Sequence, residues 1–500
     1  MLDYTRRDFL KRMATGLAIM LGPTGTSARM EEEMKQERPN LVFVFPDQFR
    51  QQAIGYMNQD PVVTPNLDRF ASEGVVFTNA VSNYPVCSPY RAMLFTSKYP
   101  NSNGVITNCN SDTAKYNVFL RESDRCLSDV LHDTGYSQGY IGKFHLDTPS
   151  EANYEYTEGR RGDGKVWDAY TPPGPRRHGF DFWHSYGCCD WHLTPHYWEG
   201  NTEVSERIDV SEWSVKHETD VAVEYIRNQD GKHREPGKPF SLFVAFNPPH
   251  TPFQQVPPEY LEAYAGKSNE DLLNRPNVRL EEQGAAAGRY AKHYFAAVTG
   301  IDEQFGRILD ALKEEGIQED TIVIFSADHG EMMGSHALMH KGVWYDESLL
   351  IPFIISWPGK LKPRRDDLLL SVPDIMPSLL SLMGLKDHIP DEVEGTDYSG
   401  AILGGSAERP GSALYLVMSP NWPEGGRRGL RTHRYTLVVQ RRKGKGEVYI
   451  LHDNERDPYQ MRNAADENPD VVRQLMKELN QWLEKTNDPW LEGSSIQNSG

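Results

Sequence analysis

Several features that define other classes of protein are scarce in this 500-residue sequence. It has no uninterrupted run of 18 apolar residues and its mean hydropathy is −0.62, which excludes a multispan membrane protein. Its five cysteines are too few for a disulfide scaffold. Lys and Arg number 53 against 71 Asp and Glu, and the net charge of −18 argues against a general nucleic-acid-binding protein. Any site for an anion must therefore be built locally, against the field of the whole molecule.

Short apolar runs alternate with helical patterns along most of the chain. The runs expected to form buried parallel strands are Leu41–Phe45, Tyr140–Ile141 with its flanks, Phe240–Phe246, Thr321–Phe325 and Pro352–Ser356. Thr64-Pro65 predicts the start of a helix that Gly74 ends, and apolar residues keep helical spacing from Tyr294 to Leu312. This alternation predicts an α/β fold with a large, mostly parallel sheet sandwiched by helices.

Polar residues follow several of the expected strands. Asp47, Lys143, Asn247 and Asp328 all lie just past a strand end, where sheets of this kind place their sites.

The composition and the expected secondary structure change in the last fifth of the chain. Residues 385–410 are rich in Gly, Asp, Glu and Ser and predict a linker, so we expect a catalytic domain over 38–390 and a smaller domain over 410–490. Short strands are expected at Ala413–Met418, Tyr435–Gln440 and Glu447–Leu451, with an antiparallel hairpin turn at 443–446. An amphipathic helix over Asp470–Lys485 completes a predicted α+β subdomain of antiparallel sheet plus helix.

The N-terminus predicts an export signal. Arg6-Arg7 precedes a modest apolar stretch, and the small residues Thr26 and Ala28 suit cleavage after Ala28. We therefore expect residues 1–28 to be a twin-arginine signal peptide, read by the twin-arginine export machinery, and the mature protein to be periplasmic or secreted. A lipid anchor is not expected, because there is no cysteine near the cleavage site.

An oxidising compartment would permit a Cys109–Cys126 bridge, which the sequence does not determine. Cys188 and Cys189 are adjacent and are not expected to bridge each other.

One short motif carries the strongest functional signal. Cys87-Ser88-Pro89-Tyr90-Arg91 is followed by Ala92–Pro100 and by Asn103-Gly104-Val105. This segment resembles the type I sulfatases of the alkaline-phosphatase superfamily, and the resemblance extends over nearly all of residues 38–485. It implies that Cys87 is oxidised to formylglycine (3-oxoalanine) by a formylglycine-generating enzyme, and that Arg91 supports the modified residue.

A second cluster predicts a metal site. Ser326-Ala327-Asp328-His329-Gly330-Glu331 follows an expected strand, and a carboxylate beside an imidazole suits a divalent cation. The resemblance implies a calcium ion held by Asp47, Asp328, His329 and the residue at position 87. Gln48 stands where many relatives carry a second acid, a variant the family also shows, and it is included among the ligands.

Basic residues match the family positions around the sulfate: Lys143 and Lys341 as binding residues, His145 and His250 as catalytic ones. Positive donors that converge on a sulfuryl group would stabilise its transition state. The resemblance implies attack on sulfur by the hydrated aldehyde at position 87. His250, with Lys341, would then protonate the leaving alcohol oxygen, and His145 would take the proton of the second hydroxyl.

An aromatic stretch points to the substrate. Residues 183–198 contain three Trp and three His, among them Trp191 and His192, which would contact sugar rings and hydroxyls. Secreted carbohydrate sulfatases resemble this region, so a sulfated polysaccharide or its oligosaccharides is the expected substrate; a packed loop core would give the same pattern.

Two other functions stay open. One is a phosphonate monoester or phosphodiester hydrolase of the same superfamily. The other is an inactive sulfated-glycan-binding protein. The intact site residues argue against it: Cys87, Arg91, Lys143, His145, His250, Asp328 and Lys341.

Overall fold

A ten-stranded sheet forms the centre of the molecule. The structure, a computed structural model, describes residues 38–149, 164–406 and 408–495, so the predicted signal peptide lies outside the described residues. The strands lie in the order β10 (Arg364–Ser371), β2 (Val75–Val81), β9 (Ile354–Ser356), β8 (Thr321–Phe325), β1 (Asn40–Val44), β7 (Phe240–Ala245), β3 (Ser137–Lys143), β4 (Phe182–Tyr186), β5 (His196–Glu199) and β6 (Ile208–Asp209).

The middle of this sheet is parallel, as the continuous apolar runs predicted. β1 pairs in parallel with β8 on one side and with β7 on the other, and β7 pairs in parallel with β3. Leu41 to Val44 are completely buried, because both faces of the sheet are covered.

The prediction of a parallel strand at Pro352–Ser356 is wrong in direction. β9 covers only 354–356 and runs antiparallel to both β8 and β2. After β8, residues 326–350 stay at the carboxyl edge of the sheet and form part of the polar cluster described below. The next strand therefore starts from that same edge and must run back, since a parallel strand would need a crossover to the opposite edge.

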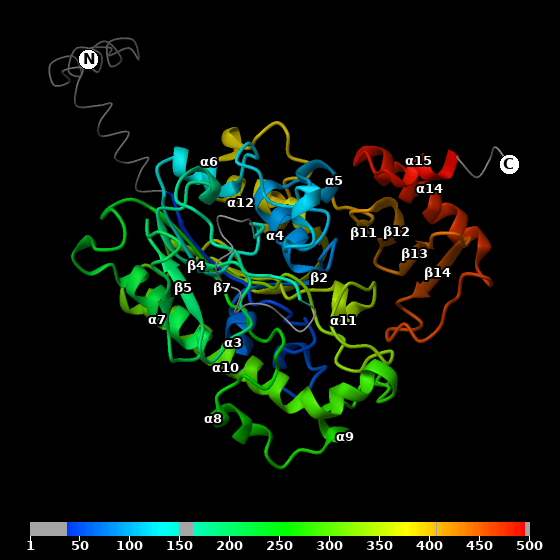
Figure 1. Ribbon diagram of the computed structural model, residues 1–500, viewed down its shortest axis with the longest axis horizontal. Coiled ribbons are helices and arrows are strands. Elements are labelled where there is room, and N and C mark those ends of the chain that lie inside the picture. Colours follow the sequence, from blue (N-terminus) through cyan, green and yellow to red (C-terminus); the bar gives the residue numbers. More distant parts are fainter. Residues whose placement is uncertain (1–37, 150–163, 407, 496–500) are drawn as a thin grey trace, which may run out of the picture. The chain divides into compact units, whose positions relative to one another are not determined.

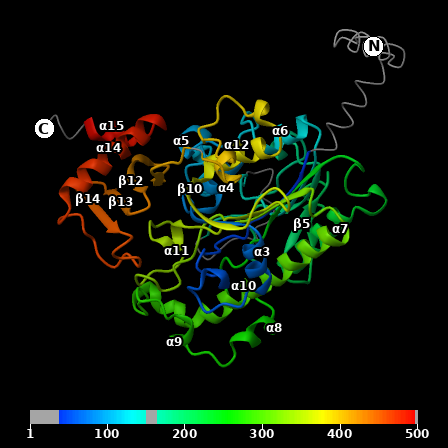
Figure 2. The same cartoon turned by 180° about the vertical axis from the view of Figure 1, so that it is seen from behind.

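Helices cover both faces of the sheet, as Figures 1 and 2 show. On one face lie α3 (Pro65–Glu73), α7 (Ser214–Arg227) and the long α10 (Ala287–Glu314), with the short α8 (Pro258–Leu261) and α9 (Asn269–Leu272) beside α10. On the other lie α4 (Cys87–Thr96), α6 (Leu127–Asp133) and α12 (Val372–Leu382), with α5 (Pro100–Asn103) next to α4. In the described part of the chain no helix is long and apolar enough to cross a membrane.

The helix predicted from Thr64-Pro65 is confirmed, although its cap differs from the expectation. Thr64 occupies the N-cap position and Gly74 the C-cap position of α3. The Thr64 hydroxyl makes no capping bond; it accepts a hydrogen bond from the Gly55 backbone instead.

A second, antiparallel sheet follows, in the order β11 (Ala413–Ser419), β12 (Trp422–Arg431), β13 (Tyr435–Arg441) and β14 (Glu447–Asp453). Three of these strands match the predicted ones. β12 was not predicted, because Gly425, Gly426 and Gly429 and several charges interrupt its apolar pattern. Helices α14 (Pro469–Lys485) and α15 (Trp490–Ser495) pack against β12.

The predicted linker is packed rather than extended. It contains α13 (Ser399–Ile402), and Ile402 belongs to the main core. The domain boundaries at 390 and 410 stay a prediction.

All five cysteines are buried and free, so the structure contains no Cys109–Cys126 bridge.

Candidate active site

Polar side chains meet at the carboxyl edge of the large sheet. Asp47 follows β1, Lys143 ends β3, Asn247 follows β7 and Asp328 follows β8. The Lys143 Nζ lies 2.7 Å from Asp47 Oδ2 and 3.0 Å from Asn247 Oδ1. The parallel strands therefore bring together residues that lie far apart in the sequence.

Cys87 is the first residue of α4 and lies against this cluster. Its Sγ is 3.3 Å from His329 Nε2, 3.6 Å from Asp47 Oδ1 and 3.9 Å from Lys143 Nζ. Burial and Asp47 act to raise the pKa of the thiol, but the charges of Lys143, Lys341 and His329 outweigh them and hold it well below its usual value. The N-terminal end of a helix also favours negative charge. This position stabilises an anionic group.

The segment that leads into α4 is held by the second sheet. The Leu416 backbone N–H donates to Asn83 O at 2.9 Å, and Asn83 Nδ2 donates to Leu414 O at 2.7 Å. The Tyr84 hydroxyl donates to Met418 O at 3.0 Å and accepts from Met418 N–H at 3.1 Å. Strand β11 thus fixes the residues just before Cys87.

Four ligand-type side chains surround one point. The ligand atoms of Asp47, Cys87, Asp328 and His329 all lie within 4.8 Å of one another, and all four residues are buried. The His329 Nδ1 contacts Gly330 O at 3.0 Å, which directs Nε2 toward the two carboxylates at 3.4 and 3.5 Å. Buried carboxylates facing an imidazole nitrogen and a thiol sulfur fit a divalent cation.

The two carboxylates differ in their electrostatic surroundings. Burial raises the pKa of both. Lys143, His250 and Lys341 more than offset this for Asp47, whose pKa lies well below its usual value. For Asp328 the neighbouring Asp47 charge adds to burial, and the pKa rises to about 6.

Arg91 lies one turn after Cys87 and is completely buried. Its Nη1 donates to Lys143 O at 2.5 Å, and its Nη2 lies 3.0 Å from Asp328 Oδ2 and 3.4 Å from Asp47 Oδ2. The guanidinium also packs 5.0 Å from the centre of the Phe45 ring. Arg91 therefore fixes both carboxylates and the end of β3.

Gln48 bridges two charged residues. Lys341 Nζ donates to its Oε1 at 2.6 Å, and its Nε2 donates to Glu331 Oε2 at 2.5 Å. A cation on one side and a carboxylate on the other determine which way the amide faces. The amide oxygen of Gln48 accepts from Lys341, and its backbone N–H donates to Asp328 Oδ1 at 3.1 Å. The place of Gln48 among the metal ligands stays a prediction.

The two predicted catalytic histidines have different partners. The His145 Nε2 contacts Cys109 O at 3.0 Å; burial lowers the pKa of His145, but the thiols of Cys188 and Cys87 raise it to about 9. The His250 Nδ1 contacts Thr251 O at 2.8 Å and lies 3.4 Å from Asp190 Oδ1. Burial together with Lys341 and Lys143 lowers the pKa of His250 to about 4.

The two predicted sugar contacts lie in the loop next to Asp190. Trp191 is 41% exposed, so its ring is available to a ligand. His192 is buried, and its Nε2 lies 3.3 Å from Asn247 Nδ2. The structure therefore leaves Trp191 accessible to a ligand, whereas His192 is buried against Asn247.

Sequence reasoning assigned no role to three residues that the structure places in the cluster. Asn247 contacts Lys143, Asp190 contacts His250, and Glu331 contacts Gln48. A signal existed for Asn247, which follows a buried strand, and for Glu331, which ends the Asp328 motif. No local pattern marks Asp190.

Comparison with known proteins identifies the family. The family model described as sulfatase matches residues 39–385, and the model for the C-terminal part of N-sulphoglucosamine sulphohydrolase matches residues 334–488. The chain belongs to the sulfatase family. The Endo-4-O-sulfatase of Bacteroides thetaiotaomicron is 42% identical to this sulfatase over 93% of its length and 96% of the relative's length. The Ulvan-active sulfatase of Formosa agariphila is 34% identical over 92% and 84%.

Solved structures agree with this sulfatase in fold. A Bacteroides fragilis sulfatase structure superposes with a TM-score of 0.85 at 42% identity, covering 92% of this chain and 98% of that one. A phosphonate monoester hydrolase of Agrobacterium radiobacter matches with a TM-score of 0.63 at 21% identity, covering 91% and 97%, which shows a shared fold alone.

Proposed function

We propose that this sulfatase hydrolyses sulfate esters on a sulfated polysaccharide or its oligosaccharides, with residue 87 as the nucleophile. The observation that carries the proposal is the surroundings of residue 87. The ligand atoms of Asp47, Asp328 and His329 lie within 4.8 Å of its sulfur, and Lys143 Nζ lies 3.9 Å from it.

Two groups would complete the site. Asp47, Asp328, His329 and residue 87 would hold a calcium ion, and Cys87 would be converted to formylglycine by a formylglycine-generating enzyme. The hydrated aldehyde would supply one hydroxyl for attack on sulfur and a second that lets the sulfate depart, and the cation would lower the pKa of the attacking hydroxyl. The donor set fits both groups, because it offers buried carboxylates and cations around one position.

The remaining residues act on the substrate. Lys143 and Lys341 hold the sulfuryl oxygens, and Arg91 keeps the two aspartates in place. His250 gives a proton to the leaving alcohol oxygen, and the sulfate it approaches offsets the lysine charges that lower its pKa. His145 takes the proton from the second hydroxyl of residue 87. Conversion of Cys87 would remove the smaller of the two thiol contributions to the pKa of His145, while that of Cys188 would remain.

The substrate class is supported by the relatives and by Trp191. The similar proteins include an Endo-4-O-sulfatase and an Ulvan-active sulfatase, and a structure described within glycosaminoglycan metabolism matches at 41% identity. An exposed aromatic ring in the loop of Asp190, which contacts His250, suits stacking on a sugar ring.

We also propose that the protein is exported by the twin-arginine route and acts in the periplasm or outside the cell. The paired Arg6 and Arg7 support this. Export in the folded state allows Cys87 to be modified before export.

A desulfation panel tests the proposal. The purified enzyme is incubated with sulfated oligosaccharides of known structure, an aryl sulfate and an aryl phosphodiester, and the position of sulfate loss is read by NMR. We expect loss of one type of sugar sulfate, no loss with Cys87→Ala, and a formylglycine mass at residue 87. Preference for the phosphodiester would show that the proposal is wrong.

A further inference from the structure

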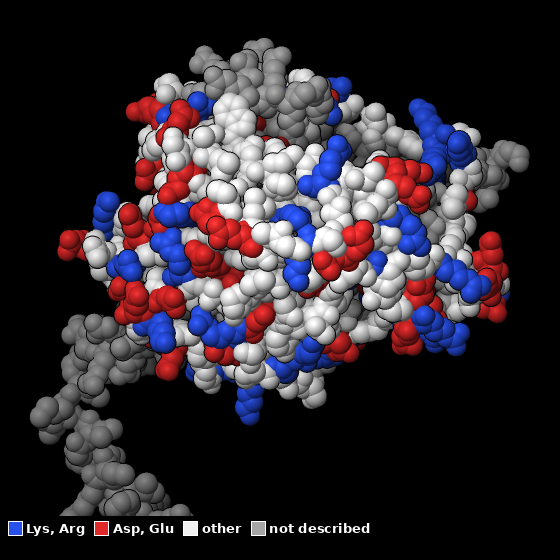
Figure 3. Space-filling view, turned by 90° about the horizontal axis from the view of Figure 1, so that it is seen from below, with Lys and Arg blue, Asp and Glu red and all other residues white. Residues whose placement is uncertain are grey.

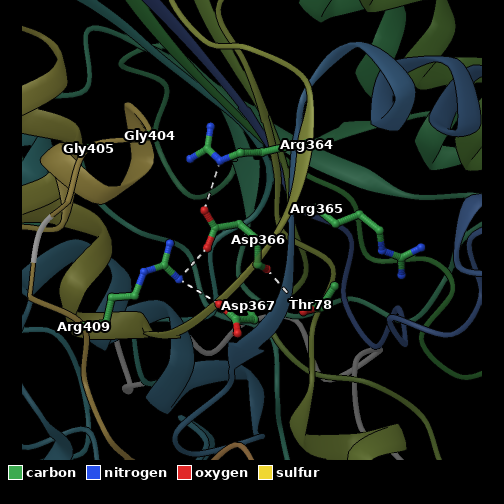
Figure 4. A pocket seen from close by; sticks show the side chains of 8 residues that line it. All are labelled: Thr78, Arg364, Arg365, Asp366, Asp367, Gly404, Gly405 and Arg409. Atoms are coloured by element: carbon green, nitrogen blue, oxygen red, sulfur yellow. Dashed lines mark hydrogen bonds and ion pairs between the residues drawn. The ribbon is translucent and has the colours of Figure 1, made fainter.

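Arginines of the second sheet, and of the segment before it, form ion pairs with the rest of the fold. Arg409, just before β11, lies 2.8 Å from Asp366 and 2.9 Å from Asp367, both in β10. Figure 4 shows these side chains at a pocket beside β10. Arg431 of β12 likewise lies 2.6 Å from Asp346. These pairs neutralise the arginines and hold the second sheet in place.

Arg427 of β12 has a different partner. It forms no ion pair in the described part of the chain, and its Nη1 donates to the backbone oxygen of Gly342 at 3.0 Å. Its guanidinium also lies 5.4 Å from the centre of the Trp344 ring. Gly342 directly follows Lys341 in the sequence. Arg427 therefore holds the backbone beside a residue that we propose to bind the sulfuryl oxygens.

Gly342 is held by two further hydrogen bonds. The Tyr415 hydroxyl, on β11, donates to Gly342 O at 3.2 Å, so this oxygen has two donors from the second sheet. The Gly342 N–H donates to Pro85 O at 3.1 Å, two residues before Cys87. The backbone after Lys341 thus joins the second sheet to the segment that leads into residue 87.

A third strand of the second sheet holds the same loop. Trp344 Nε1 donates to His452 Nε2 on β14 at 3.1 Å, and the Trp344 side chain is 8% exposed. This buried contact fixes the ring against which Arg427 packs. The loop that follows Lys341 therefore depends on β11, β12 and β14.

The backbone before Lys341 is held by the large sheet instead. Glu331, which follows β8, is completely buried, and its Oε1 accepts from the His340 N–H at 2.8 Å. Its Oε2 accepts from Gln48 Nε2, and Gln48 Oε1 accepts from Lys341 Nζ at 2.6 Å. Lys341 thus lies between two anchors, Glu331 on one side and the donors to Gly342 on the other.

We propose that Arg427 is a positioning residue, which holds Lys341 toward residue 87 through Gly342. This inference rests on the proposed function, because it takes Lys341 as a residue that binds the sulfuryl oxygens. Gly342 has a φ of 83°, and glycine has more accessible backbone conformations than any other residue. Loss of its donors would let this backbone move, so that Lys341 would be held less firmly for the sulfate.

Steady-state kinetics on an aryl sulfate test this role. Arg427→Met keeps a long side chain against Trp344 but removes the donors, and should raise KM about tenfold while kcat changes less than about twofold. Arg427→Lys, which can still donate to Gly342 O, should recover most of this loss. The matched control is Arg442→Met, an exposed substitution on the hairpin after β13, which should behave as wild type.

A double-mutant cycle separates positioning from direct contact with the substrate. In a Lys341→Ala background, Arg427→Met should raise KM by less than about twofold, because the side chain that it positions is already absent. Tyr415→Phe, which removes only a hydroxyl, should raise KM about threefold in the wild-type background and should have no effect without Lys341. Equal effects of Arg427→Met in both backgrounds, or a loss that Arg427→Lys fails to recover, would overturn the inference.

Chemical labelling of full-length protein distinguishes this inference from the proposed function, since it needs no turnover. Acetic anhydride acetylates free amines, and peptide mass spectrometry gives the rate at Lys341 relative to the exposed Lys443. Arg427→Met should raise this ratio about fivefold, because the ammonium would leave Gln48 more often. An unchanged ratio in an active sulfatase would overturn the inference alone. A raised ratio in a protein that hydrolyses no sulfate ester would support the positioning of Lys341 and overturn the proposed function.

Discussion

The two histidines that we propose as catalytic have different neighbours, which supports the different tasks proposed for them. His250 lies near Asp190, whereas the thiols of Cys188 and Cys87 act on His145. The first is suited to the leaving alcohol and the second to residue 87 itself.

We expect His250→Ala to lower turnover of a sugar sulfate about 100-fold or more while sparing much of the rate on an aryl sulfate. A sugar alkoxide is a poor leaving group and needs a proton, whereas a phenolate does not. His145→Ala should slow both substrates and leave a sulfated adduct on residue 87, visible by mass spectrometry. The division of tasks is refuted if both variants show the same substrate dependence and neither traps an adduct.

The pH dependence of sugar-sulfate turnover should reflect the protonation of His250. A general acid must be protonated, so the rate falls as pH rises through its pKa. The kcat/KM profile reflects the free enzyme, where the pKa of His250 is about 4. The kcat profile should break at higher pH, because bound sulfate offsets the charges of Lys341 and Lys143. Identical breaks in both profiles, or a break that survives His250→Ala, would contradict this assignment.

Substitutions can test which of the proposed residues bind the metal. Asp328→Asn should weaken calcium binding at least about tenfold, measured by calorimetry, because it removes a charged ligand. Gln48→Ala should leave calcium affinity close to wild type and raise KM, since it frees Lys341. Equal losses of calcium affinity in the two variants would show that Gln48 is as strong a ligand as Asp328.

The motifs predicted most of these side chains, but not how the backbone presents them. Gln48 and His145 follow β1 and β3 in the left-handed region, with φ of 66° and 51°. Neither is glycine, so the sequence gives no sign of this turn. The pairing of Gln48 with Lys341 depends on residues about 290 positions apart, which no local pattern reveals.

Among the elements, β12 shows how a strand can form without an apolar pattern. Arg428 is completely buried; its Nε and Nη2 contact the Asp488 carboxylate at 2.6 and 2.8 Å, and its guanidinium lies 5.2 Å from the centre of the Trp490 ring. The glycines destabilise β12. Its hydrogen bonds to β11 and β13, together with this ion pair, compensate for that loss of stability. Continuous apolar strands such as β1 were predicted from composition alone. The existence of β12 and the direction of β9 depend instead on the neighbouring strands and side chains that each contacts in the fold.

Arg428→Ala should lower the free energy of unfolding by about 3–5 kcal/mol, because Asp488 would remain buried and unpaired. Arg442→Ala, an exposed substitution on the neighbouring hairpin, serves as the control and should change it little. Urea unfolding followed by circular dichroism measures both. A loss below about 1 kcal/mol for Arg428→Ala would show that the pair does not hold β12 in place.

At the scale of the whole molecule, acidic residues outnumber basic ones by 71 to 53. On the face in Figure 3, acidic and basic side chains are interspersed. The cations that we propose to meet an anionic substrate, Lys143 and Lys341, are instead placed locally around residue 87. The enzyme thus attracts its ligand by local contacts rather than by its net charge of −18.

The contact between β11 and the segment before Cys87 places a limit on when residue 87 can be modified. Cys87 is 1% exposed in the folded chain, and Asn83 and Tyr84 are fixed by a strand that the ribosome makes much later. At about 5–20 residues per second, tens of seconds separate the synthesis of Cys87 from that of Ala413. We expect the modifying enzyme to act within that interval. A chain truncated after residue 412 should be converted at Cys87 during co-expression, whereas purified, folded full-length protein should resist conversion, as mass spectrometry of the Cys87 peptide would reveal. Rapid conversion of the folded protein would mean that the second sheet opens readily, and that modification can wait until synthesis has finished.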